Sequence, residues 1–272
     1  MPLRLRLRNA SPVPIEVDTV RLPTVREQTS DQVLATEVLH GNVREPLGEF
    51  FDANGSATDD NTLVWEGDCH GIKRIAERLT DGLVRIEGIA GMHLGAFMKG
   101  GVIDVSGNAS DWIGAEMSGG LIRIGGNAGG QIGAAYRGSL TGMTAGTIVV
   151  EGSAGLEVGM RMKRGTIVVK GLAKDFTGLE MKGGTIILGG AELRTGAWMN
   201  RGTIISLTPI PLLPTFAYNC SYNPTFLRIY ARELETLGVS LPFEESEGSY
   251  ELYSGDAAVS RKGELLVWQP AG

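Results

Sequence analysis

A glycine-anchored repeat of about 19 residues is the feature that most restricts the fold of this chain. Seven segments open on a glycine that is followed by alternating apolar residues, at Gly82, Gly101, Gly120, Gly146, Gly165, Gly184 and Gly202. The intervals between these glycines are 19, 19, 26, 19, 19 and 18 residues. A unit of this size is too small to bury its own apolar face, so successive units must stack on one another.

The apolar residues of each unit follow the period of a strand. The second and fourth residues after the opening glycine are apolar, as in Val84 and Ile86 or Ile148 and Val150. Parallel strands stacked about 4.8 Å apart would bury these residues in one continuous column. The sequence therefore predicts an all-β fold, a right-handed parallel β-helix of about seven coils. We expect it to have a short capping helix before it and an extended segment with one helix after it.

Glycine and methionine recur at fixed places in the repeat. Thirty of the 40 glycines lie in residues 82–202, where short coils need sharp corners or a close approach of the backbone. We expect these structural corners at Gly88, Gly107, Gly126, Gly152, Gly171 and Gly190. Methionines stand three residues before six of the opening glycines, at Met98, Met117, Met143, Met162, Met181 and Met199. They predict an inward ladder that fills the core, because a column does not bring soft metal ligands together at one point.

The segments on either side of the repeat are expected to cover its ends. Residues 72–79 carry apolar residues at i, i+3, i+4 and i+7, which predicts a short amphipathic helix. Residues 62–67 align with the repeat at a 21-residue interval and predict an irregular first coil. Asn223 and Pro224 are typical of a helix start, and this helix would run to Gly238. The predicted organisation is an N-terminal extension with a strand (1–61), which docks on the chain itself or on a partner, a β-helix (62–207) and a C-terminal cap (208–272).

Composition excludes several classes of partner and location. The chain has 31 acidic and 25 basic residues, a formal charge of −6, which is unlike a protein that binds nucleic acid. The first residues alternate leucine and arginine where a signal peptide would need an apolar run, and no 18 apolar residues follow one another. We therefore expect a cytoplasmic protein without a membrane partner. Cys69 and Cys220 lack metal-binding or redox spacing, so both are expected to be buried, reduced thiols.

The sequence offers no set of residues that would form a catalytic, cofactor-binding or metal site. Asp68, Cys69 and His70 are the usual parts of such sites, but neighbours along a strand point in different directions. The glycine run of residues 125–130 lacks the Gly-Lys-Ser/Thr that a phosphate loop requires. We therefore predict no catalytic, cofactor or metal residues in this chain.

The outward positions of the repeat are unusually apolar. The first and third residues after the opening glycine should face outward, and they include Val102, Val149, Val168 and Ile187. Apolar patches of this kind usually mark contacts. Either the C-terminal segment of the chain or another subunit could cover this strip.

The 26-residue interval contains an insertion that must leave the coil and return. It falls between Gly133 and Met143 and carries Tyr136, Arg137 and Leu140. Tyrosine and arginine are enriched at interface hot spots, so we hypothesise that these three residues contact a neighbouring subunit. The alternative is a solvated loop, because the entropy of loop closure grows slowly with length.

The repeat resembles a β-helix that is known from two families. The stretch from Gly100 to Ala109, continued by Gly114 to Met117 and by Gly119-Gly120, is similar to the C-terminal domain of the glutamate synthase large subunit and to the C subunit of formylmethanofuran dehydrogenase. The tail, with Tyr253-Ser-Gly-Asp256 followed by Arg261-Lys-Gly-Glu-Leu-Leu-Val267, resembles the second of these families, the formylmethanofuran dehydrogenase C subunits.

Two kinds of complex contain a subunit of this family, and the resemblance implies a non-catalytic scaffold in either. The first kind of complex is the formyltransferase/hydrolase complex of methylotrophic bacteria. It transfers a formyl group from tetrahydromethanopterin to a methanofuran-type carrier and releases formate. The alternative is the archaeal molybdenum or tungsten formylmethanofuran dehydrogenase, and a second alternative is a glutamate-synthase-like β-helix protein. With 18 Arg and 7 Lys and no ferredoxin-type cysteine cluster, the chain favours the bacterial complex.

The resemblance also implies what the chain would bind. Its partners would be the hydrolase-like, dehydrogenase-like and formyltransferase subunits of the same complex. The chain itself would hold no cofactor and would not be an enzyme on its own. Any methanofuran-type carrier and any metals would lie in the other subunits.

Overall fold

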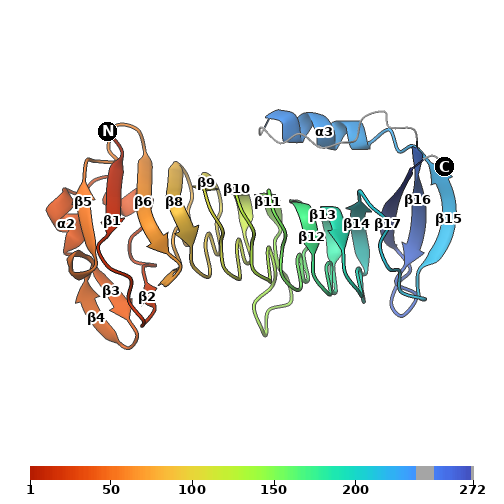
Figure 1. Ribbon diagram of the computed structural model, residues 1–272, viewed down its shortest axis with the longest axis horizontal. Coiled ribbons are helices and arrows are strands. Elements are labelled where there is room, and N and C mark those ends of the chain that lie inside the picture. Colours follow the sequence, from red (N-terminus) through yellow and green to blue (C-terminus); the bar gives the residue numbers. More distant parts are fainter. Residues whose placement is uncertain (237–247, 271–272) are drawn as a thin grey trace.

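The computed structural model describes residues 1–236 and 248–270. Its strands are stacked along the long axis of the molecule, and Figure 1 shows the N-terminal elements at one end and the C-terminal strands at the other. One 13-stranded sheet runs through this stack, in the order β15-β16-β17-β14-β13-β12-β11-β10-β9-β8-β6-β1-β5.

Parallel strands form the middle of the sheet and follow one another in sequence order. They are β6 (Thr62–Cys69), β8 (Leu83–Ala90), β9 (Val102–Val105), β10 (Ser118–Ile124), β11 (Ala145–Val150), β12 (Thr166–Ala173), β13 (Lys182–Ala191) and β14 (Arg201–Ser206). Equivalent repeat positions pair directly, since Ile148 lies between Ile122 and Ile167. The expectation of a mainly β fold with a long parallel sheet is therefore confirmed. The handedness and the number of coils stay predictions.

Successive units also meet on a second side. Isolated parallel bridges join Ala90 to Ala109, Ala109 to Ala128 and Ala154 to Ala173. Backbone hydrogen bonds link neighbouring units at the turns as well, for example from His93 N to Asp111 O at 3.0 Å. Each unit is thus held to the next at several points around the coil.

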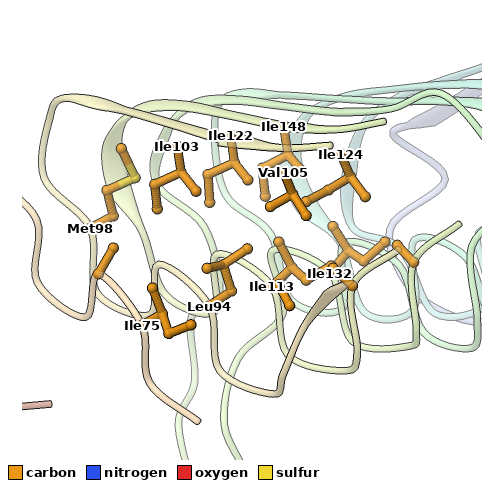
Figure 2. Packing of buried hydrophobic residues seen from close by; sticks show 14 of the residues in the cluster. Ile75, Leu94, Met98, Ile103, Val105, Ile113, Ile122, Ile124, Ile132 and Ile148 are labelled. Carbon is orange, nitrogen blue, oxygen red and sulfur yellow. The ribbon is translucent and has the colours of Figure 1, made fainter. Parts of the chain in front are cut away.

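The core is a column of apolar side chains inside the stack. Figure 2 shows isoleucines of the strands, such as Ile103 and Ile122, facing Leu94 and Ile113 from the opposite wall. The six methionines of the repeat are all 0% exposed, so the inward ladder is confirmed.

Residues 72–79 do not form the amphipathic helix that their spacing predicts. Ile72 and Lys73 form strand β7 (Ile72–Lys73), and Arg74, Ala76 and Arg78 then have φ angles of 62°, 55° and 58°. A right-handed helix excludes such angles. The prediction was wrong because Ile75 and Leu79 stand one repeat before Leu94 and Met98. The apolar spacing comes from the coil.

The N-terminal segment docks on the chain itself. Strand β1 (Leu3–Leu7) pairs in parallel with β6 and antiparallel with β5 (Phe51–Asn54). A second sheet joins β4 (Val43–Pro46), β3 (Glu37–His40), β2 (Ile15–Glu16) and β7. The helical elements here are α1 (Leu22–Val25), α2 (Ser30–Leu34) and the 3-10 helix η1 (Leu47–Glu49). Helix α2 starts with a capping box between Thr29 and Gln32 and packs against β5.

The C-terminal segment extends the sheet at the other end. Strand β17 (Gly263–Pro270) pairs in parallel with β14, β16 (Gly248–Gly255) pairs antiparallel with β17, and β15 (Ala217–Tyr222) pairs antiparallel with β16. Helix α3 (Leu227–Thr236) begins three residues after the predicted start, because Pro224 precedes a turn closed by Leu227 N on Pro224 O at 3.2 Å. The predicted end, Gly238, lies outside the described residues.

Helix α3 covers part of the outward apolar strip. Val149, Val168, Ile187 and Ile205 are at most 1% exposed and form one cluster with Leu227 and Leu234 of the helix. The Tyr230 hydroxyl and Thr185 Oγ1 are 2.8 Å apart beneath it. The chain itself therefore buries this part of the strip.

One sheet passes through all three predicted segments, so strand pairing does not test the boundaries at 61 and 207. Those boundaries stay predictions. Among the helices of residues 1–236 and 248–270, none has the length and apolar composition needed to cross a bilayer.

Five of the six predicted glycine corners are places of close backbone approach, and at Gly190 the nearest atoms belong to the side chains of Thr208 and Leu172. Of the six, Gly88 alone has a positive φ, of 148°. A Cβ atom on Gly152 would lie 2.3 Å from Asn127 Oδ1 and 2.9 Å from Gly126 O. Asn127 Oδ1 also accepts a hydrogen bond from Ser153 N at 2.8 Å. The preceding coil therefore leaves no space for a side chain at this corner.

We expect Gly152→Ala to lower the free energy of unfolding by about 1–3 kcal/mol, because the added methyl group displaces the Asn127 amide and the Gly126 carbonyl. Gly71→Ala is the control, since a Cβ there would meet its nearest atom at an ordinary 3.6 Å. Chemical denaturation of both variants measures the difference. Equal stability of the two variants would contradict the steric explanation.

Candidate functional site

The inserted loop at residues 134–142 is the candidate site, and one of its residues is anchored to the coils. Tyr136 is half-buried, with its hydroxyl 2.9 Å from His93 Nδ1 and its ring stacked on Trp112 at a centroid distance of 5.0 Å. Its backbone N–H donates to Glu116 Oε1 at 3.0 Å. Tyr136 therefore holds the loop against the stack.

Four rings form what we call the aromatic cluster: His93, Phe97, Trp112 and Tyr136. Its members come from two neighbouring coils and from the inserted loop, because His93 and Trp112 occupy the same repeat position 19 residues apart. The Arg78 guanidinium lies 4.7 Å from the Phe97 ring centroid and adds a cation–π contact at the edge.

The far side of the loop is held by side chains of later coils, which donate hydrogen bonds to its backbone carbonyl groups. Arg161 Nη1 donates to Ser139 O at 2.7 Å, and the same guanidinium pairs with Glu180 through bonds of 2.8 and 3.2 Å. Lys182 Nζ donates to Leu140 O. The loop is thus anchored to the coils at both of its sides.

The three predicted contact residues have different environments. Arg137 is exposed and Leu140 is 73% exposed, while Tyr136 is used within the fold. The structure therefore places two of the three where another molecule can reach them. Sequence reasoning missed His93 and Trp112 as the partners of Tyr136.

Burial sets the charge state of the aromatic cluster. Burial, followed by the positive charges of Arg74 and Lys73, lowers the pKa of His93 from 6.5. Burial raises the pKa of Tyr136 to about 12. At neutral pH the His93–Tyr136 hydrogen bond therefore joins two uncharged groups.

Asp68, Cys69 and His70 do not form a joint site. Cys69 is buried, and burial raises the pKa of its thiol to about 12. His70 is exposed, and its Nδ1 lies 3.2 Å from Ser110 Oγ of the next coil but one. In the part of the chain that the structure describes, no three His, Cys, Asp or Glu residues are placed to hold a metal ion. Cys220 is exposed on β15, so the prediction of two buried thiols was wrong for this residue.

A cavity that the sequence does not signal lies between the N-terminal segment and the first coils. Its volume is about 520 Å³, and its walls include Ser11, Val13, His70, Lys73 and Asp111. None of the loop residues 134–142 lines it.

Comparison with known proteins gives a family match and a match to a solved structure over nearly the whole chain. Residues 72–209 match the family described as GXGXG motif. The chain superposes, with a TM-score of 0.90 and 31% identity, on a chain in the crystal structure of the formyltransferase/hydrolase complex (FhcABCD) from Methylorubrum extorquens in complex with methylofuran. That match covers 99% of this chain and 100% of the other.

Archaeal relatives match over a shorter stretch. The C subunit of the molybdenum-containing formylmethanofuran dehydrogenase 1 of Methanothermobacter marburgensis is 40% identical over 83 residues, 30% of this chain and 21% of that protein. The C subunit of the tungsten-containing formylmethanofuran dehydrogenase 2 of Methanococcus maripaludis is 34% identical over 92 residues, 34% of each chain. The chain thus spans between a fifth and about a third of the length of these relatives.

We expect the aromatic cluster to make stability depend on pH. The pKa of His93 is lowered in the folded state, so neutral His93 is favoured by folding. Its contribution to the free energy of unfolding is therefore complete above the unfolded pKa of 6.5 and is lost as the pH falls from there through the folded pKa. Melting temperatures measured at intervals between about pH 7.5 and pH 5 test this. The fall should be smaller in His93→Asn than in wild type or in the control His70→Asn. A slope unchanged in His93→Asn would contradict the assignment.

Proposed function

The chain belongs to the GXGXG motif family, and we propose that it is a non-catalytic scaffold subunit, a right-handed parallel β-helix, in a formyltransferase/hydrolase complex. The observation that carries the proposal is the match to a chain of the FhcABCD complex, which covers 99% of this chain at 31% identity. It includes the N-terminal strands and the β15–β17 end as well as the repeat.

The extent of the match supports the bacterial type of complex over the archaeal one. The archaeal dehydrogenase subunits match over 30–34% of this chain in the examples above, whereas the FhcABCD chain matches it from end to end. We therefore place the bacterial type of complex first and the archaeal dehydrogenase second.

The proposed role assigns the chemistry to other subunits. The Cys69 thiol, with a pKa raised to about 12, is protonated at neutral pH and is a poor nucleophile. The long, tightly packed stack suits a rigid support on which hydrolase-like, dehydrogenase-like and formyltransferase subunits are held. In this proposal a methanofuran-type carrier and any metals are bound by those subunits, and the complex is cytoplasmic.

The complex can be isolated through this chain to test the proposal. An affinity tag is placed on the chain in its native host, and the purified material is analysed by native mass spectrometry and assayed for turnover. We expect a formyltransferase subunit and a hydrolase-like subunit to co-purify. The complex should release formate from formyl-tetrahydromethanopterin without an electron acceptor, and the isolated chain should release none. Recovery of the chain alone would overturn the proposal, and formate oxidation that requires a redox dye would favour the archaeal type.

The exposed part of the inserted loop gives a second test. We propose that Arg137 and Leu140 contact a neighbouring subunit, so Arg137→Ala with Leu140→Ala should release that subunit from the purified complex while the melting temperature of the chain stays unchanged. Tyr136→Phe is the control for the buried side of the loop. It removes the hydroxyl that meets His93, so it should lower the melting temperature and leave assembly intact. Full assembly of the double variant would contradict a subunit contact at Arg137 and Leu140 and would indicate that the loop is solvated.

A further inference from the structure

Within residues 1–236 and 248–270, the C-terminal end of the long sheet is an open strand edge. β15 is the last strand in the sheet order and lies at the extreme C-terminal end in Figure 1. All six of its residues are exposed, and its outer edge pairs with none of the residues that the structure describes. The backbone N–H and C=O groups along this edge are therefore available to another strand.

The opposite end of the same sheet is closed. Its last strand, β5, buries Phe51 completely and is covered by α2, and Asp52 on it forms an ion pair with Arg8 at 2.8 Å. Proteins protect edge strands with such covers and charges because bare edges recruit other strands. β15 (Ala-Tyr-Asn-Cys-Ser-Tyr) carries no charge and no proline. The contrast between the two ends points to a function for the open one.

A β-bulge at Asn219 gives β15 an aromatic residue on each face. Tyr218 pairs with Tyr253 while Cys220 pairs with Leu252, so the register shifts by one residue between them. Tyr218 therefore lies on the Tyr253 face and Tyr222, opposite Tyr250, lies on the other. Their side chains are 55% and 37% exposed. A strand added to β15 would find an aromatic side chain beside it on either face.

We propose that β15 is the docking edge for a strand of another subunit, which adds to the sheet by main-chain hydrogen bonds and covers both of its faces. The inference rests on the proposed function, because it takes the partner from the same complex. The chemistry of the partner follows from β15 itself. It is an uncharged strand whose neighbouring surface is apolar enough to bury Tyr218 and Tyr222.

A second copy of this chain fits the edge less well. Two β15 strands paired about a two-fold axis would satisfy the main chain, but each would bring only another strand with both faces exposed. Tyr218 and Tyr222 would then be covered only by the side chains of one six-residue strand, all of whose residues are exposed in the isolated chain. The bulge at Asn219 would also have to match its own symmetry mate. A larger partner has neither restriction.

The first experiment uses Cys220 as a reporter of the edge. Cys220 is exposed, whereas Cys69 is buried with a thiol pKa of about 12, so iodoacetamide modifies Cys220 selectively at neutral pH. The rate is measured by mass spectrometry on the isolated chain and on the purified complex. We expect modification to be slower in the complex by about tenfold or more, because a partner strand and the surface beside it would cover the thiol.

The second experiment introduces charge on the edge. Tyr218→Lys and Tyr222→Lys each place an ammonium group where the partner strand would lie, and each should release one subunit from the purified complex. The matched control is Val43→Lys, which adds the same charge at a 53% exposed position on β4, the edge strand of the small sheet. The melting temperatures of all three isolated variants show whether the chain still folds.

The outcomes separate this inference from the proposed function. If no complex is recovered through the wild-type chain, the proposed function fails. If the complex is intact but Cys220 reacts as fast as in the isolated chain, the edge is open in the assembly and the inference is overturned. The inference is also overturned if the isolated chain is a dimer that protects Cys220 and loses this protection in Tyr222→Lys, because the occupant is then a second copy.

Discussion

Hydrogen bonding between coils of nearly equal length is the constraint on which the rest of this structure depends. Equivalent residues pair from strand to strand, as Ile122, Ile148 and Ile167 do, and the methionine column follows the same register. A change of length within a strand would break both, whereas the 18-residue interval before Gly202 shows that a turn can lose one residue while the pairing and the buried Met199 are kept. The seven extra residues of the longest interval therefore leave the coil, and Met143 N bonds back to Gly133 O at 2.8 Å to close the base of the loop. Surface features must be added outside the register.

The same register decides where the chain can cover itself. The third residue after the opening glycine is charged in the first three units (Arg85, Asp104, Arg123) and apolar in the later ones, where α3 packs on Val149 and Ile187. A helix with Leu227 and Leu234 on one face is stabilised by burial only where it lies over the apolar residues of the later units. The residue at this one repeat position therefore decides which part of the outer surface is exposed and which part is covered by α3.

Sequence alone gives the strand alternation, the parallel stacking and the buried methionines, because each follows from the repeat. It fails where a second cause produces the same pattern, as in residues 72–79, whose helical spacing is a by-product of the coil. Strand β17 had a signal, since Gly263, Leu265 and Val267 repeat the opening pattern 61 residues after Gly202. The partners of Tyr136 had none, because His93 and Trp112 reach it only once the coils are stacked.

A stack of parallel coils has a length that changes only in fixed steps. Inserting or deleting one whole unit in the middle would move the closed α2 end and the open β15 end apart or together by about one strand spacing, 4.8 Å, and would leave the chemistry of both ends untouched. The number of coils between two surface features therefore sets the distance between them. Under the proposed function, a subunit on the open β15 edge and another on the inserted loop would be set apart by a fixed number of coils, and adding or removing one unit between them would change that distance without altering either contact surface.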